Sequence, residues 1–196
     1  MRIVGILLAA GAGARFGGAK LLAPLPAASH GVSAGTPIGV AAAMHLMAAL
    51  NDVVAVVRPR DHVLESALTN TGARVVVCDH ADEGMGVSLA CGVREGGIAD
   101  GWVIALADMP WIAPDSISAV ANAIRSGAEI AAASYRGERG HPVGFGKSYF
   151  RALTALTGDE GARGIVAARK WVLKEVDVAD PGVMRDVDHP MDLREG

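Results

Sequence analysis

Hydrophobic positions along the chain form short, nearly continuous apolar runs, and amphipathic segments lie between them. Apolar runs of about four to eight residues that are rich in β-branched side chains and bounded by Gly, Pro or Asp are typical of buried strands. The sequence predicts such strands over residues 2–9, 52–57, 73–78, 101–107 and 130–135, a shorter strand at 142–145 and a half-buried strand at 171–178.

Helix signals lie between these strands. Thr36 followed by Pro37 is typical of a helix cap and first position, and Pro114 with Gly127 marks the two ends of another helix. Helices are predicted over residues 37–50, 61–70, 86–95, 114–125, 148–157 and 161–169, with a last turn at 190–194. Residues 23–37 carry three prolines and are predicted to be a long irregular segment.

This alternation of strands and helices predicts an α/β fold: a doubly wound, mainly parallel sheet with helices on both faces. Such sheets bind ligands beyond the carboxyl ends of their strands. A chain of 196 residues is long enough for one such domain, which we place over residues 1–196.

Composition excludes several classes of function. The net charge of −3 gives no reason to expect nucleic acid or an anionic membrane as a partner. No apolar run reaches the ~18 residues of a membrane span. The apolar start could be a secretory signal, but its basic region is Arg2 alone and Lys20 closes the segment. With two cysteines that make no disulfide framework, we expect a reducing cytoplasm.

The stretch 3–20, IVGILLAAGAGARFGGAK, runs from an apolar strand into a glycine-rich loop. Glycine lets backbone N–H groups turn towards an anion, and Arg15 and Lys20 add positive charge, so the loop is predicted to hold a polyphosphate. The alternative is an ordinary glycine-rich turn. The spacing fits neither G-x-G-x-x-G, because position 16 is Phe, nor the G-K-[ST] ending of a P-loop.

Asp108 follows the apolar run GWVIALA directly, so a strand would hold its carboxylate in place. Mg²⁺ binds one or two carboxylates together with substrate phosphates, which makes Asp108 a candidate metal ligand. An Asp in the turn before a helix is the structural alternative, and the residues alone leave the two interpretations equal.

Eight residues match the pattern L-A-A-G-x-G-x-R-x-G-x-x-K without a gap: Leu8, Ala9, Ala10, Gly11, Gly13, Arg15, Gly17 and Lys20. This stretch resembles the signature of the MobA-like nucleotidyltransferases, and most of all the molybdenum cofactor cytidylyltransferases. Their guanylyl relatives usually read L-A-G-G at this place. The resemblance covers essentially the whole chain and implies a sheet of the nucleotide-diphospho-sugar transferase type.

The resemblance also implies roles for individual residues. Arg15 and Lys20 would be catalytic, and Asp108 and Asp188 would hold Mg²⁺, with His189 standing where the family usually has Thr. Nucleotide-binding positions would be Leu8, Ala9, Ala10, Gly11, Gly13, Gly84, Met85 and Ser88. Arg139 and His141 would face the acceptor; the structural alternatives are a solvated turn for Arg139 and a packed or surface histidine for His141. Residues 158–163, GDEGAR, would either shape the acceptor pocket or simply start a helix.

The implied reaction is transfer of CMP from CTP to the terminal phosphate of molybdenum-bound molybdopterin, with release of pyrophosphate. Implied partners are CTP or GTP, a molybdopterin-type acceptor, and a molybdenum hydroxylase or its maturation factor. Three alternatives stay open: guanylyl transfer to the same cofactor, cytidylyl transfer to a sugar or polyol phosphate, and a non-catalytic cofactor carrier.

Overall fold

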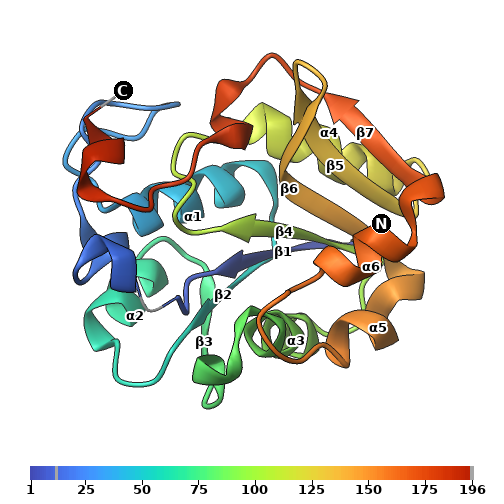
Figure 1. Ribbon diagram of the computed structural model, residues 1–196, viewed down its shortest axis with the longest axis horizontal. Helices are drawn as coiled ribbons and strands as arrows, with labels where there is room; N and C mark the ends of the chain where they lie inside the picture. Colours follow the sequence, from blue (N-terminus) through green and yellow to red (C-terminus); the bar gives the residue numbers. More distant parts are fainter. Residues whose placement is uncertain (12, 195–196) are drawn as a thin grey trace.

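A seven-stranded sheet forms the centre of the structure (Figure 1), a computed structural model that describes residues 1–11 and 13–194. Ala12 of the predicted glycine loop lies outside the described residues. The strands are β1 (Ile3–Leu8), β2 (Val53–Val57), β3 (Arg74–Val77), β4 (Gly101–Leu106), β5 (Ile130–Tyr135), β6 (Glu138–Gly146) and β7 (Leu173–Asp177). Their order is β3-β2-β1-β4-β6-β5-β7, and only β6 in the described sheet runs antiparallel to its neighbours.

Helices cover both faces of this sheet, which confirms the doubly wound fold. They are α1 (Ile38–Ala49), α2 (His62–Thr69), α3 (Met85–Gly96), α4 (Pro114–Arg125), α5 (Phe150–Thr154) and α6 (Arg163–Ala168). Side chains of β1 alternate between the faces, as the period of two in a strand requires. Ile3 and Leu7 pack in one core with α1 and α4, whereas Val4 and Ile6 pack in the other with α3 and α5. These two groups of helices lie on opposite faces of the sheet (Figure 1).

The predicted bounds of β5 and α4 are those of the structure, whereas β6 is longer than the four residues expected. Arg136 and Gly137 have φ of 53° and 81°, the two positive values of a tight hairpin turn between β5 and β6. The turn pairs Ser134 with Arg139 and extends β6 back to Glu138. Asn-Gly and Asp-Gly are the usual signals of this turn, and Arg-Gly is not among them.

The predicted Thr36 cap of α1 is wrong. Pro37 occupies the N-cap position, and no side chain caps this end of the helix. The preceding segment 23–37 is irregular, as predicted, but it is held by its own hydrogen bonds and by two isolated bridges, Pro24–Pro37 and Ser29–Val32. Leu25 and Val32 are buried in the core, so this segment is part of the packed domain.

The two predicted C-terminal helices are shorter than expected. Residues 148–157 form a 3₁₀ turn, Lys147–Tyr149, followed by the single short helix α5. The predicted strand at 171–178 narrows to β7, because Trp171 lies in the 3₁₀ turn Lys170–Val172. The last turn, Pro190–Leu193, is present as expected.

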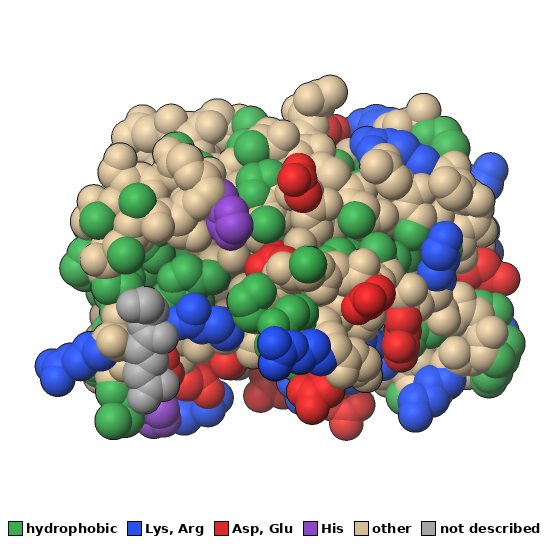
Figure 2. Space-filling model, turned by 90° about the horizontal axis from the view of Figure 1, so that it is seen from above, with side chains coloured by type: hydrophobic (Ala, Val, Ile, Leu, Met, Phe, Trp, Pro, Cys, Tyr) green, Lys and Arg blue, Asp and Glu red, His purple; other side chains and the backbone are tan. Residues whose placement is uncertain are grey.

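Acidic and basic side chains are mixed over the face seen in Figure 2, in keeping with the small net charge. Among the helices of the described chain, none has the length and apolar character needed to cross a membrane.

Candidate functional site

A cleft of about 900 Å³ lies at the carboxyl ends of β1 to β4. Parallel strands bring these ends to one edge of the sheet, the usual place for a ligand in an open α/β fold. The cleft is lined by these residues singled out from the sequence: Leu8, Ala10, Gly11, Gly13, Arg15, Lys20, Gly84, Met85, Ser88, Asp108 and Asp188. The fold therefore gathers four distant segments of the chain into one site.

Three of the residues that the resemblance singled out are not among those that line the cleft: Ala9, Arg139 and His141. Ala9 is 2% exposed, and its N–H donates to the carbonyl of Val56 at 2.9 Å. Its side chain is thus part of the core, while Ala10 beside it faces the cleft.

The glycine loop closes back on itself before Lys20. Gly13 has a φ of 61°, and a Cβ at that position would lie 2.8 Å from the carbonyl oxygen of Gly18. The backbone N–H of Lys20 donates to the same oxygen at 2.7 Å. Glycine is therefore required at position 13 by both conformation and space.

The charged side chains of the cleft form one connected cluster. Lys20 Nζ lies 2.7 Å from Asp108 Oδ2 and 3.7 Å from Asp188 Oδ1. Arg15 Nη1 donates to the other oxygen of Asp188. The Lys20 side chain is only 13% exposed, which strengthens its interactions, whereas that of Arg15 is 71% exposed. Two carboxylates that are 80 positions apart in the sequence therefore share one ammonium group.

Asp188 is held in place by a residue that sequence reasoning missed. Asp192 Oδ2 accepts hydrogen bonds from the N–H groups of Asp188 at 2.8 Å and His189 at 2.6 Å, and these bonds lower the pKa of the Asp192 carboxyl. The N–H of Val187 also donates to the Asp108 carbonyl at 2.9 Å. Pro190 at the first position of this turn and Asp192 at the third match a capping pattern. This local pattern could have identified Asp192 from the sequence.

Residues 84–88 line the cleft, but their glycines have a packing reason. A Cβ on Gly84 would lie 2.4 Å from the Gly158 backbone, and Gly86 N–H donates to the Gly158 carbonyl at 2.7 Å. Asp159 Oδ1 accepts from Met85 N–H at 3.2 Å. The segment 158–163 therefore supports the wall at 84–88, and Ser88 lies inside α3, where its hydroxyl donates to the Gly84 carbonyl at 3.4 Å.

His141 lies on β6, close enough to Asp108 for the carboxylate to affect its ionisation. Burial lowers the pKa of His141 to about 4, the Asp108 carboxylate opposes this shift, and Arg163 and Arg139 add to it. Among the described residues, the buried Nδ1 of His141 has no hydrogen-bond partner. His141 is therefore neutral at pH 7, and Arg139 on the same strand is exposed.

Four charged residues in the cleft were missed from the sequence: Arg58, Arg60, Asp79 and Asp82. Arg58 and Asp79 follow β2 and β3, so a charge just after a predicted strand was the available signal. Arg60 has a φ of 69°, a left-handed conformation that is uncommon for residues other than glycine.

Asp108 and Asp188 are hard oxygen donors that already face one cation, Lys20 Nζ. Mg²⁺ characteristically combines one or two carboxylates with substrate phosphates. Across residues 1–11 and 13–194, no group of three or more His, Cys, Asp or Glu side chains could hold a metal by itself. The donor set thus fits a divalent cation that arrives with phosphate ligands of its own.

Comparison with known proteins identifies relatives along nearly the whole chain. Residues 5–175 match the family model of the MobA-like NTP transferase domain. Purine catabolism protein PucB of Bacillus subtilis (strain 168) is 32% identical over 96% of this chain and 92% of its own. Nicotine blue oxidoreductase of Paenarthrobacter nicotinovorans is 28% identical over 95% of this chain and 92% of its own.

Solved structures agree with these relatives. Rv0371c from Mycobacterium tuberculosis H37Rv superposes with a TM-score of 0.80 at 27% identity, covering 99% of this chain and 96% of its own. A manganese complex of Rv0371c is also known, with a TM-score of 0.73 at 26% identity, covering 99% of this chain and 97% of that one. The chain belongs to the MobA-like NTP transferase family and is a nucleotidyltransferase of that type.

Proposed function

We propose that this nucleotidyltransferase transfers CMP from CTP to the terminal phosphate of molybdenum-bound molybdopterin and releases pyrophosphate. The observation that carries the proposal is the cleft cluster, in which Lys20 and Arg15 meet Asp108 and Asp188 beside the glycine loop. Cations beside a backbone loop suit a triphosphate, and two carboxylates suit its metal. The choice of CTP and of this acceptor rests on the sequence resemblance around Ala10.

In the proposed reaction, an acceptor phosphate oxygen attacks the α-phosphorus of CTP and forms the new O–P bond. The bond from the α-phosphorus to the bridging oxygen breaks, and the pyrophosphate leaves with that electron pair. A phosphate monoester is already largely ionised at neutral pH, so the attack needs no protein base. The task left to the chain is positioning and charge stabilisation.

Lys20 and Arg15 have that task in the proposal. Lys20 is anchored by the tight turn at Gly18 and by Asp108, so it approaches the triphosphate from a fixed position. Arg15 is exposed at the mouth and would neutralise the departing pyrophosphate. Asp108 and Asp188 would hold Mg²⁺, which when bound polarises phosphate oxygens and neutralises their charge. Asp192 fixes the backbone that presents Asp188.

The acceptor would enter beside β6, next to His141 and Arg139. The exposed Arg139 could meet an incoming phosphate. His141 is neutral, so it would face the acceptor side without adding charge beside Asp108. The product would then pass to a molybdenum hydroxylase or its maturation factor.

The decisive test measures pyrophosphate release with Mg²⁺, freshly isolated molybdenum cofactor and each of the four nucleoside triphosphates, together with the dinucleotide formed. We expect pyrophosphate to be released with CTP, in an amount equal to that of the cytosine dinucleotide formed. Release with GTP alone would overturn the base assignment. Release only with a sugar or polyol phosphate would overturn the acceptor, and no release with any combination would leave a cofactor carrier as the correct interpretation.

A further inference from the structure

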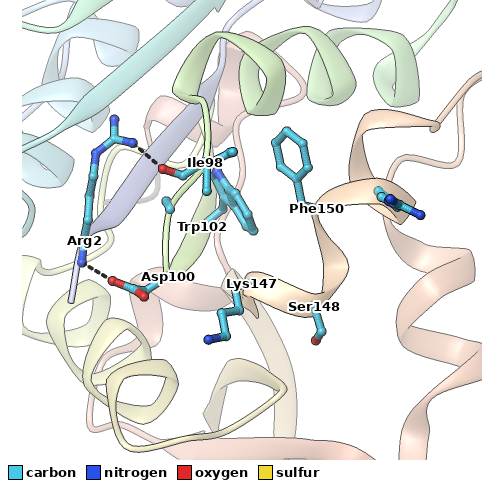
Figure 3. A pocket seen from close by; sticks show the side chains of 9 residues that line it. Arg2, Ile98, Asp100, Trp102, Lys147, Ser148 and Phe150 are labelled. Carbon is cyan, nitrogen blue, oxygen red and sulfur yellow. Dashed lines mark hydrogen bonds between the residues drawn. The ribbon is translucent and has the colours of Figure 1, made fainter.

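A second cavity, of about 510 Å³, lies at the other end of the central strands (Figure 3). Its walls come from the residue before β1, from the start of β4 and the residues before it, and from the residues after β6. We call it the amino-end cavity and define it by Arg2, Ile98, Ala99, Asp100, Trp102, Lys147, Ser148, Phe150 and Arg151. Along β4, Trp102 lines this cavity and Leu106 lines the cleft, a separation of roughly 13 Å at the rise of a strand.

Aromatic and aliphatic side chains line its floor. The rings of Trp102 and Phe150 are stacked, with centroids 5.5 Å apart and planes at 29°. Figure 3 shows Ile98 and Phe150 on either side of the Trp102 indole. The Ile98 side chain is 85% exposed although it is large and apolar. Ile98 and the half-buried Phe150 therefore present an apolar surface, with Trp102 buried beneath it.

The Trp102 indole lies beneath this surface. The residue is fully buried, and its Nε1 has no hydrogen-bond partner among the described residues. A buried N–H without a partner is costly and uncommon in folded proteins. The site of Nε1 is close to Gly96, where a Cβ would lie 3.6 Å from it, on the side of the cavity that Ile98 borders.

The basic side chains at the rim are of two kinds. Arg2 is fully engaged: it donates to Asp52 Oδ2 and to the carbonyls of Gly96 and Ile98 at 2.5–2.9 Å. Lys147 and Arg151 form no ion pair or side-chain hydrogen bond with any described residue.

One acid lies among these cations. Asp100 Oδ2 accepts from the backbone N–H of Arg2 at 2.7 Å. Asp52 balances the charge of Arg2, and Asp100 balances the charge of one of the two free cations. The rim therefore keeps an excess of one positive charge. The free cations and the uncovered apolar floor thus lie side by side.

We propose that the amino-end cavity is a second binding site, for a small aromatic anion. The ring of such a ligand packs against Phe150 and Ile98, and its carboxylate, sulfonate or phosphate meets Lys147 and Arg151. The volume lies within the range of about 300–1,000 Å³ typical of small-molecule sites, and such sites combine a mainly apolar lining with a few polar groups. This proposal is independent of which nucleotide and acceptor use the cleft.

The test uses two fluorescent probes with the same rings, anilinonaphthalene sulfonate and the uncharged phenylnaphthylamine. We expect the wild-type protein to bind one sulfonate probe per chain, also in the presence of saturating CTP and Mg²⁺. In a Trp111→Phe, Trp171→Phe background, Trp102 is the remaining tryptophan of the sequence, and its emission should be transferred to the bound probe.

Two pairs of variants locate the site. Lys147→Ala with Arg151→Ala should weaken the sulfonate probe about three- to tenfold, the scale of exposed charge contacts, and leave the neutral probe within about twofold. Lys174→Ala, an exposed lysine on β7, is the matched control. Ile98→Asp should abolish binding of the sulfonate probe, whereas Val63→Asp, at another exposed β-branched position, on α2, should not.

Circular dichroism and the melting temperature verify that each variant is folded. Displacement of the probe by CTP would place it in the cleft and overturn the proposal. Equal loss in Ile98→Asp and Val63→Asp, or unchanged binding after removal of both cations, would show adventitious surface binding and overturn it as well.

Discussion

The cleft and the amino-end cavity lie at opposite ends of the same two strands, β1 and β4, and they differ in what their cations do. In the cleft, Lys20 and Arg15 are paired with Asp108 and Asp188. At the other end, Lys147 and Arg151 have no ion pair within residues 1–11 and 13–194. A ligand in the cleft has to exchange partners with groups already in place, whereas one in the amino-end cavity meets free charges.

The two ends of the sheet therefore differ in how far their charges are preorganised. Paired cations are fixed before substrate binds, which favours positioning of a reacting phosphate. In the proposed reaction, their carboxylate partners would become available for Mg²⁺ when a phosphate pairs with Lys20 and Arg15. Within the described residues, no ion pair holds the long side chains of the free cations at the amino-end cavity, so that site can select for charge but is less suited to positioning a ligand precisely.

Removal of the shared cation should have the largest effect. We expect Lys20→Ala to lower kcat about 100- to 1,000-fold, because one charged contact to a transition state is worth about 2.7–4 kcal/mol. The pyrophosphate release assay measures this. Lys174→Ala should keep normal turnover, and a melting temperature within a few degrees would show that the fold is intact. Near-normal kcat in Lys20→Ala would mean that Lys20 is not part of the catalytic machinery.

Lower pH should destabilise the protein through His141, near the cleft, and leave the amino-end cavity unaffected. The folded state holds His141 neutral with a pKa of about 4, whereas the unfolded chain takes up the proton near 6.5. The unfolded state therefore binds more protons between these values, and up to about 3 kcal/mol of stability is lost as pH falls from 6.5 to 4.

Burial lowers the pKa of His45 as well, so it adds to the loss in the same direction. Urea unfolding at a series of pH values measures the slope. His141→Gln should flatten it, while the exposed His62→Gln should leave it as in the wild type. A slope that His141→Gln does not change would refute the role of His141.

Loss of either carboxylate proposed to hold Mg²⁺ should have the next largest effect on turnover. Asp108→Asn and Asp188→Asn should each lower Mg²⁺-dependent turnover about 10- to 100-fold, the size of one hydrogen bond to a charged group at about 1.5–3 kcal/mol. The Mg²⁺ concentration that gives half-maximal rate should rise in both variants. Asp115→Asn on α4 serves as the exposed control. If its Mg²⁺ dependence changed as much as theirs, the metal assignment would be wrong.

The smallest effect should concern the base. Ala10 lines the cleft and is 9% exposed. Its Cβ, which a glycine at this position would lack, should crowd a purine more than a pyrimidine. We expect Ala10→Gly to narrow the preference for CTP over GTP about fivefold, since one methyl group is worth about 1–3 kcal/mol. Competition between the two nucleotides in the pyrophosphate assay measures the ratio. A ratio that widened would refute the steric argument.

Local patterns determined much of this protein from the sequence. The bounds of β5 and α4, the alternation of strands and helices, and the strand that leads into the glycine loop all follow from periodicity and from Pro and Gly at the ends of elements. The motif from Leu8 to Lys20 pointed to the family that the comparisons identify. These signals are readable because each depends on residues close together in the chain.

Contacts between segments far apart in the sequence became visible only in the tertiary structure. The resemblance predicted that Asp108 and Asp188 share one cleft beside the glycine loop. It did not predict that Lys20 Nζ pairs with both carboxylates, that Asp192 holds Asp188, or that Gly84 packs on Gly158. The amino-end cavity likewise exists only because the sheet brings Arg2, Ile98 and Lys147 together. The physical reason is that chain topology, rather than any local propensity, places side chains far apart in sequence at one end of a parallel sheet.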